Sequence, residues 1–223
     1  MGKRSNFERH DRDFYPTPLK AMLPLVPFLR RDGVKTFAEP CAGDGDLVRH
    51  LESFGLRCVY AGDIATGQNA LAIERYVGNP DVGITNPPFK YPEDHKRSTR
   101  LLHDLIRHFL DLRVPFWLLL PHDWSANKGS KPYLLRCSDI VPIGRVKWIP
   151  NSEYDGGYEN SCWYRFDPSQ IKGHPVLHGR DQKEVIPARR RTCEQCGKAY
   201  TPQRSSSRFC SGACRTRACR QRS

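Results

Sequence analysis

The residues best suited to chemistry form the tetrad Asn86-Pro87-Pro88-Phe89, which ends a strand-like run that begins at Asp81. Two prolines cannot continue a sheet, so they fix a rigid backbone without competing N–H donors. The Asn86 side-chain oxygen and the Pro87 carbonyl can each accept one N–H of a planar amine, and Phe89 can stack on the ring that carries it. The tetrad predicts a site that orients a weakly nucleophilic amine. The alternative is a proline-rich turn capped by a core phenylalanine.

A second candidate site is the turn-forming stretch Glu39–Gly45, which joins a predicted strand to a predicted helix. Gly43 and Gly45 lack a Cβ and therefore let backbone amides approach a ligand closely. Asp63, at the end of the next strand-like run, can accept hydrogen bonds from two ribose hydroxyls. These residues predict a nucleoside-binding turn; the alternatives are an ordinary tight turn and a surface acid.

Four cysteines near the C-terminus form two close pairs, Cys193-x2-Cys196 and Cys210-x3-Cys214. Two pairs of thiolates are the ligand set of tetrahedral zinc, and four sulfur ligands leave no open position for catalysis. The odd total of nine cysteines, clustered towards the end of the chain, argues against a disulfide framework. We expect a structural zinc ion, and the module resembles a treble-clef finger.

Alternating strands and helices must position these sites. Continuous apolar strands that alternate with helices predict a mostly parallel α/β sheet covered on both faces. From Ser98 onward, apolar residues recur at helical spacing. The predicted strands are 34–39, 56–63, 81–86 and 114–120, followed by 144–149 and 161–166 as an antiparallel edge hairpin.

The stretch 39–45 and the tetrad 86–89 resemble the two signature motifs of class I S-adenosylmethionine-dependent amino-methyltransferases, of the type that methylates adenine N6 in DNA. The resemblance covers roughly residues 13–166. It implies a Rossmann-like fold, S-adenosylmethionine as cofactor, and direct methyl transfer catalysed by the tetrad. Asn69 stands where the family often has an Asp that holds the adenine amine of the cofactor. The cofactor-binding residues that the resemblance implies are Phe14, Tyr15, Pro16, Thr17, Glu39, Pro40, Cys41, Ala42, Gly43, Gly45, Asp63, Asn69 and Asn86.

The chain is expected to comprise a catalytic domain at 1–167, a linker at 168–191 and a zinc-finger module at 192–223. It carries a net charge of +12 at pH 7, and residues 188–223 hold ten basic residues against one acid. A basic, metal-stabilised module predicts a polyanionic partner. We expect DNA, with RNA possible, and expect the finger to hold the duplex in place of a target-recognition domain.

Membrane and secreted classes are disfavoured. No apolar run reaches the roughly 18 residues needed to cross a bilayer, and the chain starts with charged residues, so we expect a cytoplasmic protein without membrane contact. One alternative is methylation of RNA adenine or guanine, or of a protein glutamine, which the same tetrad serves. Another is a zinc-finger nucleic-acid-binding protein with an inactive methyltransferase body. Asn69 and the short connection between the strands predicted at 56–63 and 81–86 suggest this alternative. The sequence does not predict the oligomeric state.

Overall fold

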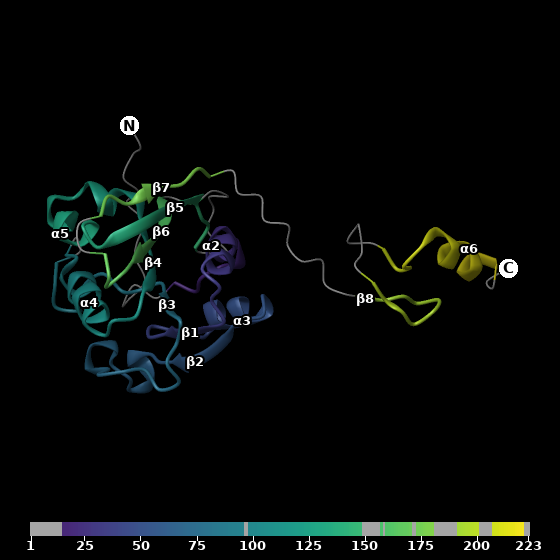
Figure 1. Cartoon of the computed structure of the whole chain (residues 1–223), viewed down its shortest axis with the longest axis horizontal. Helices are drawn as coiled ribbons and strands as arrows, with labels where there is room; N and C mark the ends of the chain where they lie inside the picture. The colour runs from purple at the N-terminus through teal and green to yellow at the C-terminus, as the bar shows by residue number, and fades with distance from the viewer. Residues whose placement is uncertain are drawn as a thin grey trace. The chain divides into compact units, whose positions relative to one another are not determined.

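The chain forms two compact units, Met1–Glu184 and Val185–Ser223 (Figure 1). The division falls inside the range 168–191 that we expected to be a linker. Phe14, expected at the cofactor site, lies outside the described residues. The computed structural model describes residues 15–95, 98–148, 157, 159–170, 173–180, 191–200 and 207–220.

The first unit is built on a seven-stranded mixed sheet, whose strand order is β2-β1-β3-β4-β6-β5-β7. The first four strands in this order run parallel, β6 pairs antiparallel with both β4 and β5, and β7 pairs parallel with β5. This confirms the predicted fold class. The strands are β1 (Thr36–Glu39), β2 (Arg57–Ala61), β3 (Val82–Thr85), β4 (Phe116–Pro121), β5 (Cys137–Arg145), β6 (Asn160–Phe166) and β7 (Val176–Leu177).

Helices cover both faces of the sheet, as Figure 1 shows. Trp117 and Leu119 of β4 pack with α1, α2 and α3, whereas Leu118 and Leu120 pack on the other face with α4. Successive strand residues point to opposite faces, so a strand covered on both sides must be apolar throughout. The helices are α1 (Leu19–Met22), α2 (Val26–Arg31), α3 (Asp46–Ser53), α4 (Arg100–Asp111) and α5 (Lys131–Leu134), with short 3-10 helices η2 (Leu23–Leu25), η3 (Ile64–Thr66), η4 (Ala70–Ala72), η5 (His122–Ala126) and η6 (Lys128–Ser130).

The connection between β2 and β3 is short, as the sequence predicted. It contains only the 3-10 helices η3 and η4, and every residue in this connection is described. Asp63 caps η3 by accepting a hydrogen bond from Ala65 N, and Asn69 caps η4 by accepting one from Leu71 N. The two polar side chains that follow β2 therefore also fix the local backbone.

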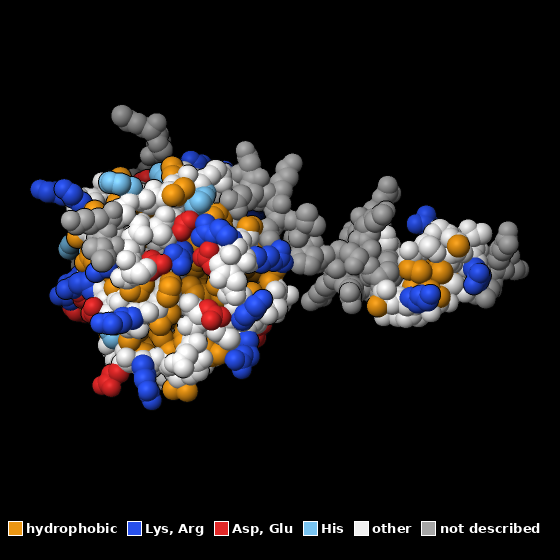
Figure 2. All heavy atoms as spheres, viewed as in Figure 1, with side chains coloured by type: hydrophobic (Ala, Val, Ile, Leu, Met, Phe, Trp, Pro, Cys, Tyr) orange, Lys and Arg blue, Asp and Glu red, His pale blue; other side chains and the backbone are white. Residues whose placement is uncertain are grey.

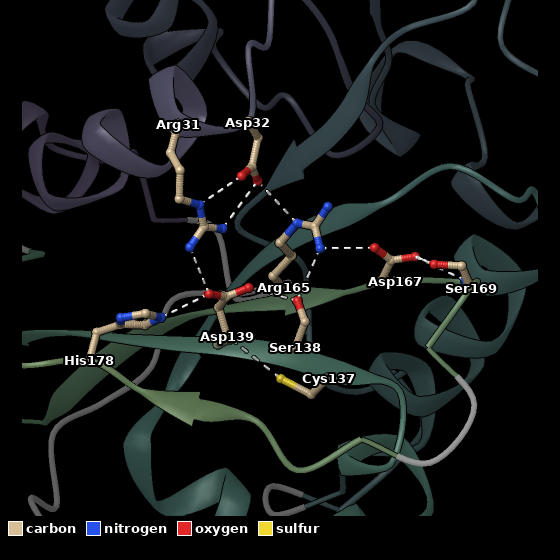
Figure 3. Close-up of polar contacts among 9 residues, drawn as sticks. All are labelled: Arg31, Asp32, Cys137, Ser138, Asp139, Arg165, Asp167, Ser169 and His178. Atoms are coloured by element: carbon tan, nitrogen blue, oxygen red, sulfur yellow. Dashed lines mark hydrogen bonds and ion pairs between the residues drawn. The ribbon is translucent and has the colours of Figure 1, made fainter.

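The edge hairpin is shifted from its expected position. The strand predicted at 144–149 is β5, which begins at Cys137 and contains Asp139 and Pro142. Asp139 is only 6% exposed, and its carboxylate is satisfied by Arg31 at 3.1 Å and His178 at 2.8 Å (Figure 3). A buried charge is tolerated when it is paired in this way. The strand β7 lies within the range expected as linker, so the sheet extends further along the chain than predicted.

The described residues of the second unit form a two-stranded antiparallel ribbon and one helix. Its elements are β8 (Arg191–Thr192), β9 (Ala199–Tyr200) and α6 (Gly212–Arg220). Within the described parts of both units, no helix is long and apolar enough to span a membrane.

Candidate functional site

A cavity of about 600 Å³ opens where β1, β2 and β3 end, and most of the predicted site residues line it. Three predicted residues, Gly45, Pro87 and Phe89, are not part of its wall. The predicted residues that line it are Tyr15, Pro16, Thr17, Glu39, Pro40, Cys41, Ala42, Gly43, Asp63, Asn69, Asn86 and Pro88.

A hydrogen bond connects the glycine turn, which contains Gly43 and Gly45, to Asp63 in the segment that follows β2. Gly43 has φ +51° and Gly45 has φ +78°, which are backbone conformations that L side chains rarely adopt. Gly43 N donates to Asp63 Oδ2 at 2.9 Å, while Asp63 Oδ1 accepts from Ala65 N at 2.8 Å. A carboxylate has about four acceptor positions, so both oxygens can still accept a ligand hydroxyl. Asp63 thus shapes the turn and faces the cavity at once.

Glu39, the last residue of β1, is a buried carboxyl group at the cavity wall, with 1% of its surface exposed. Its Oε1 accepts a hydrogen bond from Cys41 N at 3.0 Å. Burial raises the pKa of Glu39 to about 8, even though the hydrogen bond from Cys41 N opposes the shift; the Asp63 charge adds to it. Near neutral pH this side chain is therefore mostly protonated.

The Asn86 amide is held in one orientation at the end of β3. Its Nδ2 donates to the Tyr15 carbonyl oxygen at 3.3 Å. A carbonyl can only accept, so the amide nitrogen must face Tyr15, and Oδ1 remains as the acceptor of the side chain. The segment ahead of α1 thus fixes which end of Asn86 is offered to a ligand.

The other tetrad residues differ in their surroundings. Pro88 lines the cavity, whereas Pro87 is buried and is not part of the cavity wall. Phe89 is half-buried and packs against the apolar cluster that includes α4, and its carbonyl accepts from Leu102 N at 3.1 Å. The prediction that Phe89 stacks on an acceptor ring stays a prediction.

Sequence reasoning missed part of the cavity wall. Asp44 and Asp46 add two acids to one side, and the apolar residues Leu101 and Leu105 of α4 contribute to it. The two acids lie within or next to the predicted turn and could have been included. The α4 residues carried only a core-packing signal. The remaining missed residues are Leu47, Ile64, Ala65, Ala70, Leu71, Lys90, Tyr91 and Pro92.

The second unit brings together the four predicted cysteines, Cys193, Cys196, Cys210 and Cys214, whose sulfur atoms all lie within 4.8 Å of one another. The Sγ atoms of Cys196 and Cys210, and those of Cys210 and Cys214, are 3.6 Å apart. Four sulfurs at the usual Zn–S distance of about 2.3 Å form a tetrahedron with edges of about 3.8 Å. The cluster therefore fits a zinc ion.

The backbone around Cys193 favours a thiolate. Cys210 N donates to Cys193 Sγ at 3.3 Å. Burial of this thiol opposes ionisation, but amide N–H groups of Cys210, Gln195 and Cys196 together lower the pKa of Cys193 to about 6. Thiolates are the form that binds metal.

The helix α6 begins beside this cluster and is rich in arginine. Ser211 Oγ accepts from Cys214 N at 3.2 Å and so caps the helix. Arg215 and Arg217 are exposed on it, and Figure 2 shows Lys and Arg side chains on the visible face of the described part of this unit.

The sheet and its covering helices define the fold of class I methyltransferases. A solved structure with this fold is a candidate RNA methyltransferase from Pyrococcus horikoshii, at a TM-score of 0.50 and 13% sequence identity over 74% of this chain and 92% of that one. No protein-family model and no curated protein matches the sequence.

Two further solved structures match at a TM-score of 0.42. The modification subunit of a candidate type I restriction enzyme from Vibrio vulnificus is 18% identical, and the match covers 72% of this chain but 46% of that subunit. A candidate hemolysin from Lactococcus lactis is 10% identical over 77% of this chain and 94% of that one. The functional assignment therefore rests on the residues of the cavity.

Proposed function

We propose that this protein transfers a methyl group from S-adenosylmethionine to an exocyclic amine of a nucleic-acid base, and that the base is adenine in DNA, methylated at N6. The observation that carries the proposal is the orientation of Asn86. Its amide lines the same cavity as the glycine turn and Asp63, and the hydrogen bond from Nδ2 to Tyr15 leaves Oδ1 to accept an amine proton.

The cavity wall fits the proposed cofactor. Its volume lies within the range of about 300–1,000 Å³ typical of small-molecule sites. When bound, S-adenosylmethionine supplies an electrophilic methyl group on a positively charged sulfur. Even without Glu39, which is mostly protonated near neutral pH, acidic side chains outnumber basic ones in the wall, which favours a cation: Asp44, Asp46 and Asp63 against Lys90. Asp63 would accept the ribose hydroxyls while it holds the glycine turn in place.

The tetrad would prepare the acceptor. The lone pair of an amine on an aromatic ring is delocalised, which makes the amine a poor nucleophile. Asn86 Oδ1 would take one N–H at the cavity wall, and the carbonyl of Pro87, a residue outside the described wall, would have to be reached by the other; together they would orient the nitrogen and stabilise the positive charge that develops on it. Pro88, which has no N–H, offers no competing donor at this point.

The second unit supports a nucleic-acid acceptor over a protein. We infer a zinc ion held by Cys193, Cys196, Cys210 and Cys214, with a structural role because four thiolates complete its tetrahedral coordination. Exposed arginines on a metal-stabilised helix are suited to phosphate contacts. This unit would hold the duplex while the first unit carries out the transfer.

The test is expression in a bacterial host that lacks adenine methylation, followed by mass spectrometry of nucleosides from its DNA and RNA. We expect N6-methyladenine in DNA with the wild-type protein and none with Asn86→Ala, while calorimetry finds similar cofactor affinity for both. Asn127→Ala, an exposed position outside the cavity wall, is the matched control and should stay active. Full activity in Asn86→Ala would refute the catalytic role of Asn86.

Other outcomes discriminate between the alternatives. Methylated bases found only in RNA would replace DNA by RNA as acceptor. Methylated glutamine in protein, with unmodified nucleic acids, would overturn the nucleic-acid assignment. Absence of S-adenosylmethionine binding by the wild-type protein would favour a nucleic-acid-binding protein with an inactive body.

A further inference from the structure

The loop that follows the tetrad forms part of the cavity wall. Lys90, Tyr91 and Pro92 line the same cavity as Asn86 and Pro88. The loop turns back at this point, because Asp94 N donates to the Tyr91 carbonyl at 3.1 Å. Tyr91 is therefore an aromatic side chain at the wall, five residues after the proposed catalytic amide.

The Tyr91 ring is fixed by contacts with α4. Its hydroxyl donates to Asp104 Oδ2 at 2.8 Å, and the Arg100 guanidinium carbon lies 4.6 Å from the ring centroid. Arg100 is itself held by Glu93 at 2.8 Å and Asp94 at 3.2 Å. Arg100 therefore covers one face of the ring of a residue that lines the cavity.

Phe89 has a different environment. It packs with the apolar cluster around α4 and does not line the cavity, and its backbone carbonyl is tied to Leu102 N. A half-buried side chain that packs against this cluster and lies outside the cavity wall is poorly placed to accept a planar ligand of the cavity on its face. The aromatic residue of the tetrad is thus distinct from the two tyrosines that line the cavity, Tyr15 and Tyr91, and of these Tyr91 is the one that follows the tetrad directly in the chain.

We propose that Tyr91 supplies the aromatic surface against which the acceptor ring packs when its amine reaches Asn86. This inference rests on the proposed function and narrows it, because a planar aromatic acceptor, namely a nucleobase, benefits from such a surface, whereas an aliphatic glutamine amide does not. A ring that is anchored before the ligand arrives loses little conformational freedom on binding.

Steady-state kinetics with adenine-unmethylated plasmid DNA as acceptor tests this role. Tyr91→Leu is expected to raise the KM for DNA by about 10-fold or more, the range expected for loss of one base–aromatic stack. Cofactor affinity, measured by calorimetry, should be unchanged. Tyr91→Phe keeps the ring and should recover most of the lost affinity. Phe89→Leu should instead lower the melting temperature and raise the KM less than Tyr91→Leu does.

Three results would overturn the inference. An active wild type with a KM in Tyr91→Leu within twofold of the wild-type value would remove the role of Tyr91 and leave the proposed function intact. A wild type that binds cofactor but methylates neither DNA nor RNA would remove the proposed function, and the role of Tyr91 with it. A larger KM increase in Phe89→Leu, without loss of stability, would transfer the role to Phe89.

Discussion

The buried carboxyl group of Glu39 makes the stability of the first unit depend on pH, and Glu39→Gln should remove that dependence. Glutamine is uncharged and nearly isosteric with the protonated acid. Its Oε1 can still accept the hydrogen bond from Cys41 N. The substitution therefore mimics the protonated form that burial favours.

The sign and size of this pH dependence of the unfolding free energy follow from the pKa of Glu39. The pKa of this carboxyl is about 8 in the folded protein, against an ordinary value of 4.5. Between these values the folded chain keeps a proton that the unfolded chain has lost, so stability falls as pH rises by up to about 1.36 kcal/mol per pH unit. The difference between the two pKa values limits the total loss of unfolding free energy to on the order of 5 kcal/mol. We expect Glu39→Gln to exceed the wild type by about 2–5 kcal/mol above pH 8, and by almost nothing at pH 4.5.

Urea unfolding of the ligand-free protein, followed by tryptophan fluorescence at pH 5 and pH 8.5, measures this difference. All four tryptophans lie in the first unit, so the signal reports its unfolding. Glu52→Gln, at an exposed carboxylate on α3, is the control and should show no such pH-dependent gain. If Glu39→Gln gains nothing over the wild type between the two pH values, the carboxyl is ionised in the folded protein and the reasoning fails.

Three further predictions concern other parts of the molecule. Asp139→Asn should cost about 1–3 kcal/mol of unfolding free energy at pH 7, because Arg31 and His178 lose the negative charge of their shared partner. Burial opposes ionisation of Asp139, but its hydrogen bonds with Arg31, Ser138 and His178 lower its pKa below the ordinary value of 3.8, so the cost should shrink as the pH falls below that ordinary value, which urea titration can follow. Metal analysis should find one zinc per chain in the wild type and none in Cys210→Ser, and equal zinc in both would refute the site. Arg215→Gln combined with Arg217→Gln should reduce the slope of log DNA affinity against log salt by about 2, and an unchanged slope would exclude both from phosphate contact.

The fold was largely predictable because its central strands are apolar throughout. A run such as Trp117–Leu120 is stable only between two covered faces, and this predicts a sheet with helices on both sides. The strand β5 was misplaced because Asp139 interrupts its apolar run. The partners that make this carboxylate acceptable come from α2 and from His178, which are distant in sequence. No local pattern carries that information.

The candidate site was predictable where the chemistry is local. The glycines of the turn and the prolines of the tetrad restrict the backbone by themselves. The orientation of Asn86 was not predictable, since its partner Tyr15 lies 71 residues earlier in the chain. The same holds for Tyr91, whose position depends on contacts with Asp104 and Arg100 of α4.

The contact between Asn86 and Tyr15 also links two events at the cavity. Tyr15, Pro16 and Thr17 line the cavity proposed for the cofactor, and the Tyr15 carbonyl holds the amide proposed for the acceptor. A ligand that displaces this segment would therefore also displace the amide that the other ligand contacts. Thermodynamic reciprocity then requires that each ligand change the affinity of the other by the same factor. The segment ahead of α1 would thus couple binding at the proposed cofactor subsite to binding at the proposed acceptor subsite.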